Sequence, residues 1–454
     1  MKKIHNKNIM IYGTGISGIA AIKALYKLGN KIYVYDDNKS KEEVEKINDL
    51  KKSKYNYIGK ISKNLIKKID IVVKSPSIPF YNSVLERFES FKIPIYSDVE
   101  MAYRITDKDF VAVTGTNGKT TTTTLVCNIL RDAEKKVGIT GNIGSGILED
   151  VLNDKYKLFV VEASSYQLNS VYKFKPKVSI ITNITPDHLN WHKTMENYIE
   201  SKLNILKNQN KNDYAVLNYD DHNIKKNLNK AKANILFFST KRILEEGLFL
   251  ENNKIFFKTK GNKKEIIDVD NLKLLGEHNL ENIMASAGAA LVLNIPIDKI
   301  RKTISKFTGV EHRLEKVKSS IDTVSFYNDS KGTNPESTIK AVNALEENII
   351  IILGGYNKDS SFDELISNFD GKVKYVLIIG ETKYNIKKSL DKIGFNKYKL
   401  VNSLEEAVFE AYRNSNKRDK ILLSPACASW DMYKSFEERG NHFKKIIKKL
   451  EKDV

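Results

Sequence analysis

The segment that most constrains the fold is residues 110–125, where an apolar run leads into a glycine loop and then into a helical pattern. The run Phe110–Thr114 is typical of a buried β-strand. The loop that follows reads Gly-Thr-Asn-Gly-Lys-Thr over residues 115–120. In such a loop the backbone amides and a lysine hold the β- and γ-phosphates, and the next hydroxyl binds Mg²⁺. The general motif has glycine where this chain has Val113, so the sequence predicts a variant P-loop rather than a chance match.

Short β-branched runs alternate with longer amphipathic segments along most of the chain, a pattern typical of α/β folds with mostly parallel sheets. The chain has 454 residues, and at roughly 150 residues per domain we expect about three domains. We predict a Rossmann-like domain over residues 1–107, a central P-loop domain over 108–309 and a Rossmann-like domain over 310–454. The predicted strands are Asn8–Tyr12, Lys31–Tyr35, Ile69–Val73, Phe110–Thr114, Phe159–Glu162, Val178–Asn183, Ala215–Asn218, Asn348–Leu353, Tyr375–Ile379 and Lys420–Leu423.

The first glycine loop along the chain follows the first predicted strand and opens a helix. Its residues are Gly13, Thr14, Gly15, Ile16, Ser17 and Gly18. Glycines let the backbone approach a pyrophosphate at a helix N-terminus, and an acid after the second strand, here Asp36, commonly bonds a ribose hydroxyl. Taken alone, the loop suggests a dinucleotide-dependent oxidoreductase, and the alternative is a glycine-rich turn that binds nothing. The turn beginning at Ser75 follows another strand and either caps the same crevice or is a plain turn.

Acidic and imidazole side chains follow two predicted strands of the central domain. Glu162 ends one strand, and Asp187 and His188 lie just past the next. Ligands bind at the carboxyl ends of strands in open α/β sheets, and carboxylates suit Mg²⁺. His188 is either a metal ligand or a hydrogen-bond donor, and the Asp187-His188 pair alone could equally be a helix cap. Lys202 lies in a predicted helix, where a lysine is ordinarily a solvated side chain, so the residue pattern by itself predicts no function for it.

The formal net charge of +19 permits attraction of nucleic acid or of an anionic small molecule, but the lysines are scattered and form no basic tract between aromatic residues. Of the three explanations for this charge, we favour lysines spread over solvated surfaces. Attraction of phosphates ranks second and nucleic-acid binding ranks last. The two cysteines form no CxxC pair, as expected for a reducing compartment. The uncharged apolar stretch Ile283–Ile297 is shorter than the ~20 residues that span a bilayer. We therefore expect a cytoplasmic monomer that binds neither nucleic acid nor membrane.

Motifs spread over the whole chain resemble those of the Mur ligase family, whose core is related to that of the folylpolyglutamate synthases. They occupy residues 114–121, 141–144, 162–168, 183–189, 276–279, 311–315 and 328–334. Within the family, the tail segments 423–431 and 436–441 resemble the members that add D-glutamate. The Asp-Asn-Pro-Arg motif of the members that add diaminopimelate or lysine is absent.

The resemblance implies a role for each matching residue. Lys202 stands where the family carries a carbamylated lysine, and Asn142 would contact the γ-phosphate. The catalytic residues would be Lys119, His188, Lys202 and Lys331. ATP would be bound by Gly115, Thr116, Asn117, Gly118, Lys119, Thr120, Thr121, Asn142, Asn279, Asn282, His312, Arg313 and Asp329. Two Mg²⁺ ions would be held by Thr120, Glu162, His188 and carbamylated Lys202. The first glycine loop, Asp36 and Ser75 would bind the uridine diphosphate of the substrate, and D-glutamate would be held by Thr333, Lys358, Ser429 and Phe436.

The resemblance further implies an ATP-dependent amide ligase of peptidoglycan synthesis, which adds D-glutamate to UDP-N-acetylmuramoyl-L-alanine through an acyl phosphate. Hinge closure is expected, because Lys331 and the P-loop belong to different predicted domains. The chain departs from the family in two places: Asp37-Asn38 replaces a common Thr-Arg, and Tyr356-Asn357 replaces a frequent Asp-Gly. The first departure removes a cation from the presumed diphosphate site. A family member with a different amino-acid substrate, an NAD-dependent oxidoreductase and a nucleic-acid-stimulated ATPase remain alternatives.

Overall fold

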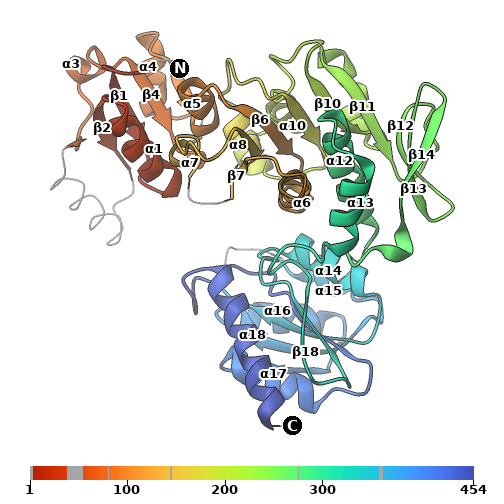
Figure 1. The fold of residues 1–454 in the computed structure, drawn as a ribbon. Coiled ribbons are helices and arrows are strands. Elements are labelled where there is room, and N and C mark those ends of the chain that lie inside the picture. Colours follow the sequence, from red (N-terminus) through yellow and green to blue (C-terminus); the bar gives the residue numbers. More distant parts are fainter. Residues whose placement is uncertain are drawn as a thin grey trace. The chain divides into compact units, whose positions relative to one another are not determined.

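The computed structural model describes residues 4–37, 55–79, 81–143, 146–274, 276–356 and 361–453. These residues form three sheets covered by helices (Figure 1), which confirms the predicted α/β class with mostly parallel sheets. The chain divides into two compact units: Met1–Leu272 with His278–Lys306, and Lys273–Glu277 with Phe307–Val454. The domain boundaries at 107/108 and 309/310 stay predictions. Among the described helices, none is both long enough and apolar enough to cross a membrane.

The N-terminal sheet of the larger unit is parallel, with the strand order β3-β2-β1-β4-β5. The order reverses at β1, which pairs with β2 on one side and β4 on the other. In open α/β sheets ligands bind outside the carboxyl ends of the strands at such a reversal. The strands are β1 (Asn8–Tyr12), β2 (Lys31–Tyr35), β3 (Asn56–Tyr57), β4 (Ile71–Lys74) and β5 (Ile95–Ser97), and the helices are α1 (Ile16–Lys27), α3 (Lys63–Ile66), α4 (Ser83–Ser90) and α5 (Asp98–Ile105).

The second sheet of this unit has the order β14-β13-β12-β11-β10-β9-β6-β8-β7. It is parallel from β7 to β12, and β12, β13 and β14 form an antiparallel meander. The strands are β6 (Asp109–Thr114), β7 (Val137–Gly141), β8 (Leu158–Glu162), β9 (Val178–Ile181), β10 (Tyr214–Asn218), β11 (Asn234–Ser239), β12 (Gly247–Glu251), β13 (Lys254–Thr259) and β14 (Asn262–Asp268). The helices are α6 (Lys119–Asp132), α7 (Ile147–Asp150), α8 (Ser165–Leu168), α9 (Leu189–His192), α10 (Met195–Leu203), α11 (His222–Lys226), α12 (Glu277–Val292) and α13 (Ile297–Lys306).

The smaller unit contains one mixed sheet in the order β15-β16-β20-β17-β18-β19. Among the strands of its described residues, only β15 and β16 pair antiparallel. β17 is buried along its whole length, as expected for a central strand covered on both faces. The strands are β15 (Glu315–Val317), β16 (Ser325–Asn328), β17 (Ile349–Gly354), β18 (Val373–Ile379), β19 (Tyr398–Leu400) and β20 (Lys420–Leu423), and the helices are α14 (Pro335–Leu345), α15 (Asp363–Ser367), α16 (Lys383–Lys392), α17 (Leu404–Arg413) and α18 (Phe436–Asp453).

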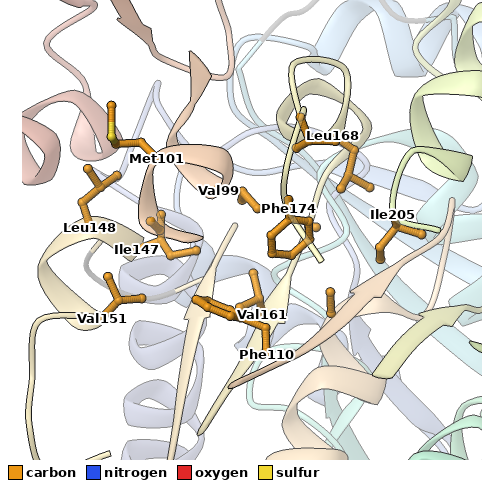
Figure 2. Close-up of a cluster of buried hydrophobic side chains, with 14 of the residues drawn as sticks. Val99, Met101, Phe110, Ile147, Leu148, Val151, Val161, Leu168, Phe174 and Ile205 are labelled. Carbon is orange, nitrogen blue, oxygen red and sulfur yellow. The ribbon is translucent and has the colours of Figure 1, made fainter. Parts of the chain in front are cut away.

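One hydrophobic core contains residues of both sheets of the larger unit. Figure 2 shows the part of this core that lies between α5, α7 and the central sheet. Val99 and Met101 of α5 and Ile147 of α7 belong to the same buried cluster as Phe110 of β6 and the loop residue Phe174. The Phe110 and Phe174 rings meet edge to face with centroids 5.9 Å apart. Burying a side chain of this size stabilises the fold by about 1.5–3 kcal/mol. The two sheets are therefore packed as one body.

Buried carboxylates at the start of α5 reinforce this packing. The Glu100 side chain accepts hydrogen bonds from the backbone N–H groups of Tyr172 at 2.9 Å, Lys173 at 3.0 Å and Phe174 at 2.8 Å, and from Arg104 Nε at 2.6 Å. Asp98 accepts two hydrogen bonds from Gln167 Nε2, at 3.1 and 3.0 Å. The two carboxylates of α5, which follows the N-terminal sheet, thus accept hydrogen bonds from Gln167 and from the loop between β8 and β9 of the central sheet.

We expect Glu100→Ala to lower the free energy of unfolding by about 3–5 kcal/mol, the usual cost of removing one partner of a buried charged pair. The substitution leaves three backbone N–H groups and Arg104 without their carboxylate. Urea unfolding monitored by tryptophan fluorescence measures the change, with the exposed Glu86→Ala as control. A loss below about 1 kcal/mol, the value typical of an exposed pair, would show that Glu100 does not secure this packing.

Candidate active site

The P-loop is held in shape by neighbouring strands. Gly118 is the N-cap of α6 at φ 81°, in the left-handed region that glycine adopts without strain. The Asn117 N–H donates to Asn183 Oδ1 at 2.9 Å, and the Asn117 carbonyl accepts from Thr182 Oγ1 at 2.6 Å. The α6 amides therefore open at the carboxyl end of β6, between β8 and β9, where a phosphate would meet them.

Two lysine ammonium groups converge on this loop. Lys119 Nζ donates to the carbonyls of Gly115 at 2.9 Å and Thr116 at 2.8 Å. Lys202 Nζ, from α10, donates to the same Gly115 carbonyl at 2.7 Å. The expectation from its helical position that Lys202 is solvated is wrong, because its residue is only 1% exposed. Burial, and secondarily the charge of Lys119, lower the pKa of Lys202 well below its ordinary value. A lysine in this setting readily holds a neutral amine.

Glu162, at the end of β8, faces Asn142. Asn142 Nδ2 donates to Glu162 Oε1 at 3.0 Å, and the Asn142 N–H donates to the Glu162 carbonyl at 2.8 Å. Glu162 Oε2 is buried and has no hydrogen-bond partner among the described residues. A buried, unsatisfied carboxylate oxygen is costly unless a cation meets it. The described residues hold no ready-made cluster of three or more His, Cys, Asp or Glu side chains, so phosphate oxygens, water and Thr120 would complete a Mg²⁺ shell.

His188 stands at the N-cap position of α9 in a left-handed conformation, φ 53°, and makes no side-chain cap hydrogen bond. Asp187 Oδ1 accepts the His188 N–H at 2.8 Å and lies 3.4 Å from His188 Nδ1. The histidine ring packs against Tyr166, with centroids 5.0 Å apart. The helix-cap alternative therefore describes the backbone position of His188 but not its imidazole, which remains a candidate ligand.

Asn279 and Asn282, which are predicted to bind ATP, come from α12, and Asn282 reaches the P-loop helix. Asn282 Oδ1 accepts from Thr122 Oγ1 at 3.2 Å, and Asn282 Nδ2 donates to Asn279 Oδ1 at 3.1 Å. A Cβ on Gly118 would lie 2.1 Å from Asn282 Oδ1. The tertiary fold thus brings these two asparagines beside the loop from more than 150 residues away in the chain.

The first glycine loop is braced by the residues predicted to act with it. Asp36 Oδ2 accepts from the Thr14 N–H at 2.6 Å and from Thr14 Oγ1 at 2.7 Å. A Cβ on Gly13 would lie 2.4 Å from Ser75 Oγ, and a Cβ on Gly18 would lie 1.9 Å from the Gly13 carbonyl. Ser75 Oγ is buried without a partner among the described residues. The turn at Ser75 therefore closes onto the glycine loop.

In the smaller unit, most of the predicted site residues gather around β16. Asp329 is buried and accepts from Ser424 Oγ at 2.7 Å and from the Leu314 N–H at 3.1 Å. Burial raises the pKa of Asp329 to about 6, against the opposing charge of Arg313. Burial also lowers the pKa of His312. The Phe436 ring lies edge to face with the His312 ring at 6.3 Å and under Lys331 Nζ at 5.4 Å.

Ser429 is buried in the loop after β20. Thr333 lies in the loop between β16 and α14, and β16 and β20 are neighbouring strands. Lys358 lies outside the described residues, in the gap 357–360. Tyr356, just before this gap, donates its backbone N–H to the Ala428 carbonyl at 2.9 Å. The loops bearing Ser429 and Tyr356 are thereby bonded to each other.

Several residues that support the site carried no recognisable signal in the sequence. Tyr198 lies under Lys202 Nζ at 4.6 Å from its ring centroid and shares a 3.0 Å hydrogen bond with Thr116 Oγ1. Lys74 is 1% exposed, donates to the Ile78 carbonyl at 3.0 Å, and burial lowers its pKa to about 8. Lys74 is thus a buried cation immediately before Ser75. Lys74 ends the otherwise apolar strand β4, and a lysine at a strand end is ordinarily expected to reach solvent.

A P-loop with two converging lysines, set in the parallel part of the central sheet, defines an enzyme of the nucleoside-triphosphate-dependent class. Three family descriptions match the chain: "Mur ligase MurD-like, N-terminal domain" over residues 7–97, "Mur ligase middle domain" over 113–290 and "Mur ligase, glutamate ligase domain" over 312–427. The UDP-N-acetylmuramoylalanine–D-glutamate ligase of Alkaliphilus oremlandii is 43% identical over 454 residues, covering 98% of this chain and 99% of its own. The ligase of the same name from Clostridioides difficile is 41% identical over 455 residues, covering 98% and 99%. The chain belongs to the Mur ligase family, as its motifs predicted.

Solved structures share the fold. The UDP-N-acetylmuramate-alanine ligase of Thermotoga maritima superposes with a TM-score of 0.60 at 19% identity, covering 99% of this chain and 100% of its own. The MurF ligase of Thermotoga maritima, determined in complex with ADP, has a TM-score of 0.58 at 18% identity, covering 99% and 97%. At these identities the likeness supports the architecture alone.

We expect Glu162→Gln to raise the Mg²⁺ concentration needed for half-maximal activity by at least about 10-fold. The amide keeps the shape of the side chain but removes the charge beside the buried Oε2 position. A Mg²⁺ titration of ADP release measures the shift, and the exposed Glu149→Gln serves as control. An unchanged Mg²⁺ requirement would remove Glu162 from the metal site.

Proposed function

We propose that this chain is the ATP-dependent ligase that joins D-glutamate to UDP-N-acetylmuramoyl-L-alanine in peptidoglycan synthesis. Full-length similarity to ligases that carry this name supports the substrates. The observation that carries the chemistry is the meeting of Lys119 and Lys202 at the Gly115 carbonyl of the P-loop. Site residues are proposed with the roles given by their motifs.

The first step activates a carboxylate, which is a poor electrophile at neutral pH. A carboxylate oxygen of the substrate's alanine attacks the γ-phosphorus of ATP, the bond from that phosphorus to the β-bridging oxygen breaks, and ADP leaves with the electron pair. An acyl phosphate remains. Because two anions must approach, the reaction depends on fixed positive charge. Lys119 and the α6 amides would hold the phosphates, and Asn142 would orient the γ-phosphate.

The second step forms the amide. The neutral amine of D-glutamate attacks the acyl carbonyl, the carbon–oxygen bond to phosphate breaks, and inorganic phosphate leaves with the electron pair. The nitrogen, positively charged after the attack, loses one proton to water. Thr333, Lys358, Ser429 and Phe436 would hold the D-glutamate. The roles of His312, Arg313, Asp329 and Lys331 toward the nucleotide belong to the same proposal.

The residues present fit Mg²⁺, because the buried Glu162 oxygen and the Thr120 hydroxyl are hard oxygen donors. When bound, Mg²⁺ would neutralise charge on the transferring phosphate. His188 and a carbamylated Lys202 would hold a second ion. CO₂ reacts with neutral amines only, and the lowered pKa of Lys202 supports that modification.

The deciding experiment measures ADP release by the purified protein with ATP, Mg²⁺ and UDP-N-acetylmuramoyl-L-alanine, with and without D-glutamate. We expect release to depend on D-glutamate and to yield one new amide per ADP. L-Glutamate, D-aspartate and L-alanine, tested in parallel, distinguish a family member with another acceptor. Release that needs neither substrate would overturn the proposal.

The remaining alternatives make separate predictions. An oxidoreductase would bind NAD at the first glycine loop, whereas we expect none in a direct titration. A nucleic-acid-dependent ATPase would be stimulated by DNA or RNA with a steep salt dependence. We expect neither polymer to change the rate at fixed ionic strength.

A further inference from the structure

The α18 helix carries a fully buried arginine that the mechanism above does not use. Arg439 is 1% exposed and lies within the smaller unit. Its Nε donates to Ser330 Oγ at 3.0 Å and its Nη1 to the Ala428 carbonyl at 3.2 Å. Its Nη2 donates to the carbonyls of Ser330 at 2.9 Å and Cys427 at 3.0 Å. One planar guanidinium therefore joins two loops to the helix that bears it.

Each bonded segment carries a residue assigned to amino-acid binding. Ser330 lies shortly before Thr333, Ala428 precedes Ser429, and Arg439 lies one helical turn after Phe436. Ser330 Oγ, which accepts from Arg439, also donates to the Phe436 carbonyl at 2.8 Å. The three segments are therefore linked through one side chain and one hydroxyl.

The loop after β20 needs such a support. Ala426 lies at φ 58°, a left-handed conformation that costs energy for a residue with a Cβ. The carbonyls of Cys427 and Ala428, which follow it, turn toward Arg439 and receive its hydrogen bonds. The Ala428 carbonyl also accepts the Tyr356 N–H, so the same atom is bonded to the chain just after β17.

Simple space-filling does not account for this arginine. A buried guanidinium loses its hydration, and an apolar residue of similar volume would avoid that cost. Burial lowers the pKa of Arg439 to about 10, which leaves it charged at neutral pH. Its N–H groups form a rigid fork that a lysine cannot reproduce. The bonding pattern indicates that geometry, rather than volume, is the property this position supplies.

We propose that Arg439 is a positioning residue that holds the segments bearing Thr333, Ser429 and Phe436 in the arrangement that binds the incoming amino acid. This inference rests on the proposed ligase function and adds to it a determinant of D-glutamate affinity. Arg439 acts through backbone carbonyls and Ser330, and it contacts none of the reacting atoms. Its loss should therefore affect one substrate selectively.

The test compares steady-state kinetics of the wild-type enzyme with Arg439→Met and Arg439→Lys. We expect Arg439→Met to raise the KM for D-glutamate by about 10- to 100-fold, since small displacements of binding groups have effects of that size. The KM values for ATP and for UDP-N-acetylmuramoyl-L-alanine should change less than about twofold. The kcat, measured at saturating D-glutamate, should stay close to the wild-type value. Arg439→Lys should give an intermediate KM, because charge is kept and the fork is lost.

Ser330→Ala keeps the proposal testable if both arginine variants unfold. It removes the hydroxyl that receives Arg439 Nε and donates to Phe436, and should raise the same KM by several-fold. Lys445→Met, which removes an exposed cation from the same helix, is the control. Equal changes in all three KM values, or a loss of kcat with an unchanged KM for D-glutamate, would overturn the inference. A wild-type enzyme without D-glutamate-dependent ADP release would instead refute the proposed function.

Discussion

Replacing Lys119 with alanine is expected to lower D-glutamate-dependent ADP release by about 10³-fold or more, the scale on which single charged groups act in phosphoryl transfer. Lys119 begins α6, and its ammonium lies over the loop carbonyls of Gly115 and Thr116. The variant removes the positive charge that would stabilise the phosphate oxygens of ATP as ADP leaves with the electron pair. Initial rates of ADP formation at saturating substrates measure the loss.

The exposed Lys135, just beyond the end of α6, supplies a matched control, because Lys135→Ala removes the same charge far from the loop. We expect that control to retain full activity. Nucleotide binding should be measured with ATP in both variants, to separate affinity from chemistry. Normal turnover by Lys119→Ala would refute the P-loop assignment and the mechanism with it.

Replacing Lys202 with methionine is expected to reduce kcat by about 10²-fold or more, a loss typical of removing one charge-stabilising group. The wild-type enzyme should incorporate label from carbon-13 bicarbonate at Lys202, and the variant should not. Burial lowers the pKa of Lys202, so more of its amine is neutral at a given pH than for an exposed lysine. Labelling should therefore persist near neutral pH and decrease as the pH falls through the lowered pKa.

Carbon-13 NMR of the enzyme in labelled bicarbonate measures this directly. Lys211→Met, which removes an exposed lysine of the same unit, should keep both the carbamate signal and the activity. If Lys202 acted only as the cation that binds the Gly115 carbonyl, Lys202→Arg would be active and unlabelled. That outcome would contradict the carbamate and leave the P-loop intact.

Much of the fold could be predicted from local pattern. The predicted strands Asn8–Tyr12, Lys31–Tyr35 and Lys420–Leu423 coincide with β1, β2 and β20. The meander β12–β14 was not predicted. Its strands β13 and β14 are partly exposed and mix polar and apolar residues without a clear period. Short edge strands such as β15 and β19 depend on pairing with a neighbour and carry little signal of their own.

The candidate site divides in the same way. The motifs around Lys119, Glu162 and His188 lie at strand ends, where the fold rule places ligands, and the structure brings the Glu162 and Lys119 segments to one sheet edge. The roles of these residues stay predictions. Glu100 gave no signal, and Arg439 stood in the tail motif 436–441 without a predicted role. An arginine or a glutamate in a helix is ordinarily solvated, and only distant partners bury it.

The amino-acid sequence by itself determined the α/β class, the variant P-loop and the family, because strand, loop and helix propensities and short motifs depend on residues adjacent in the chain. The tertiary structure decided that Lys202 is buried beside Gly115, that Asn282 reaches the P-loop helix and that Arg439 joins two loops to α18. The bonded partner lies 87 residues away in the chain for Lys202, 160 for Asn282 and 109 for Arg439. Burial and charge at such positions are set by what the fold brings together, and the pKa of a lysine or the support of a loop follows from that environment.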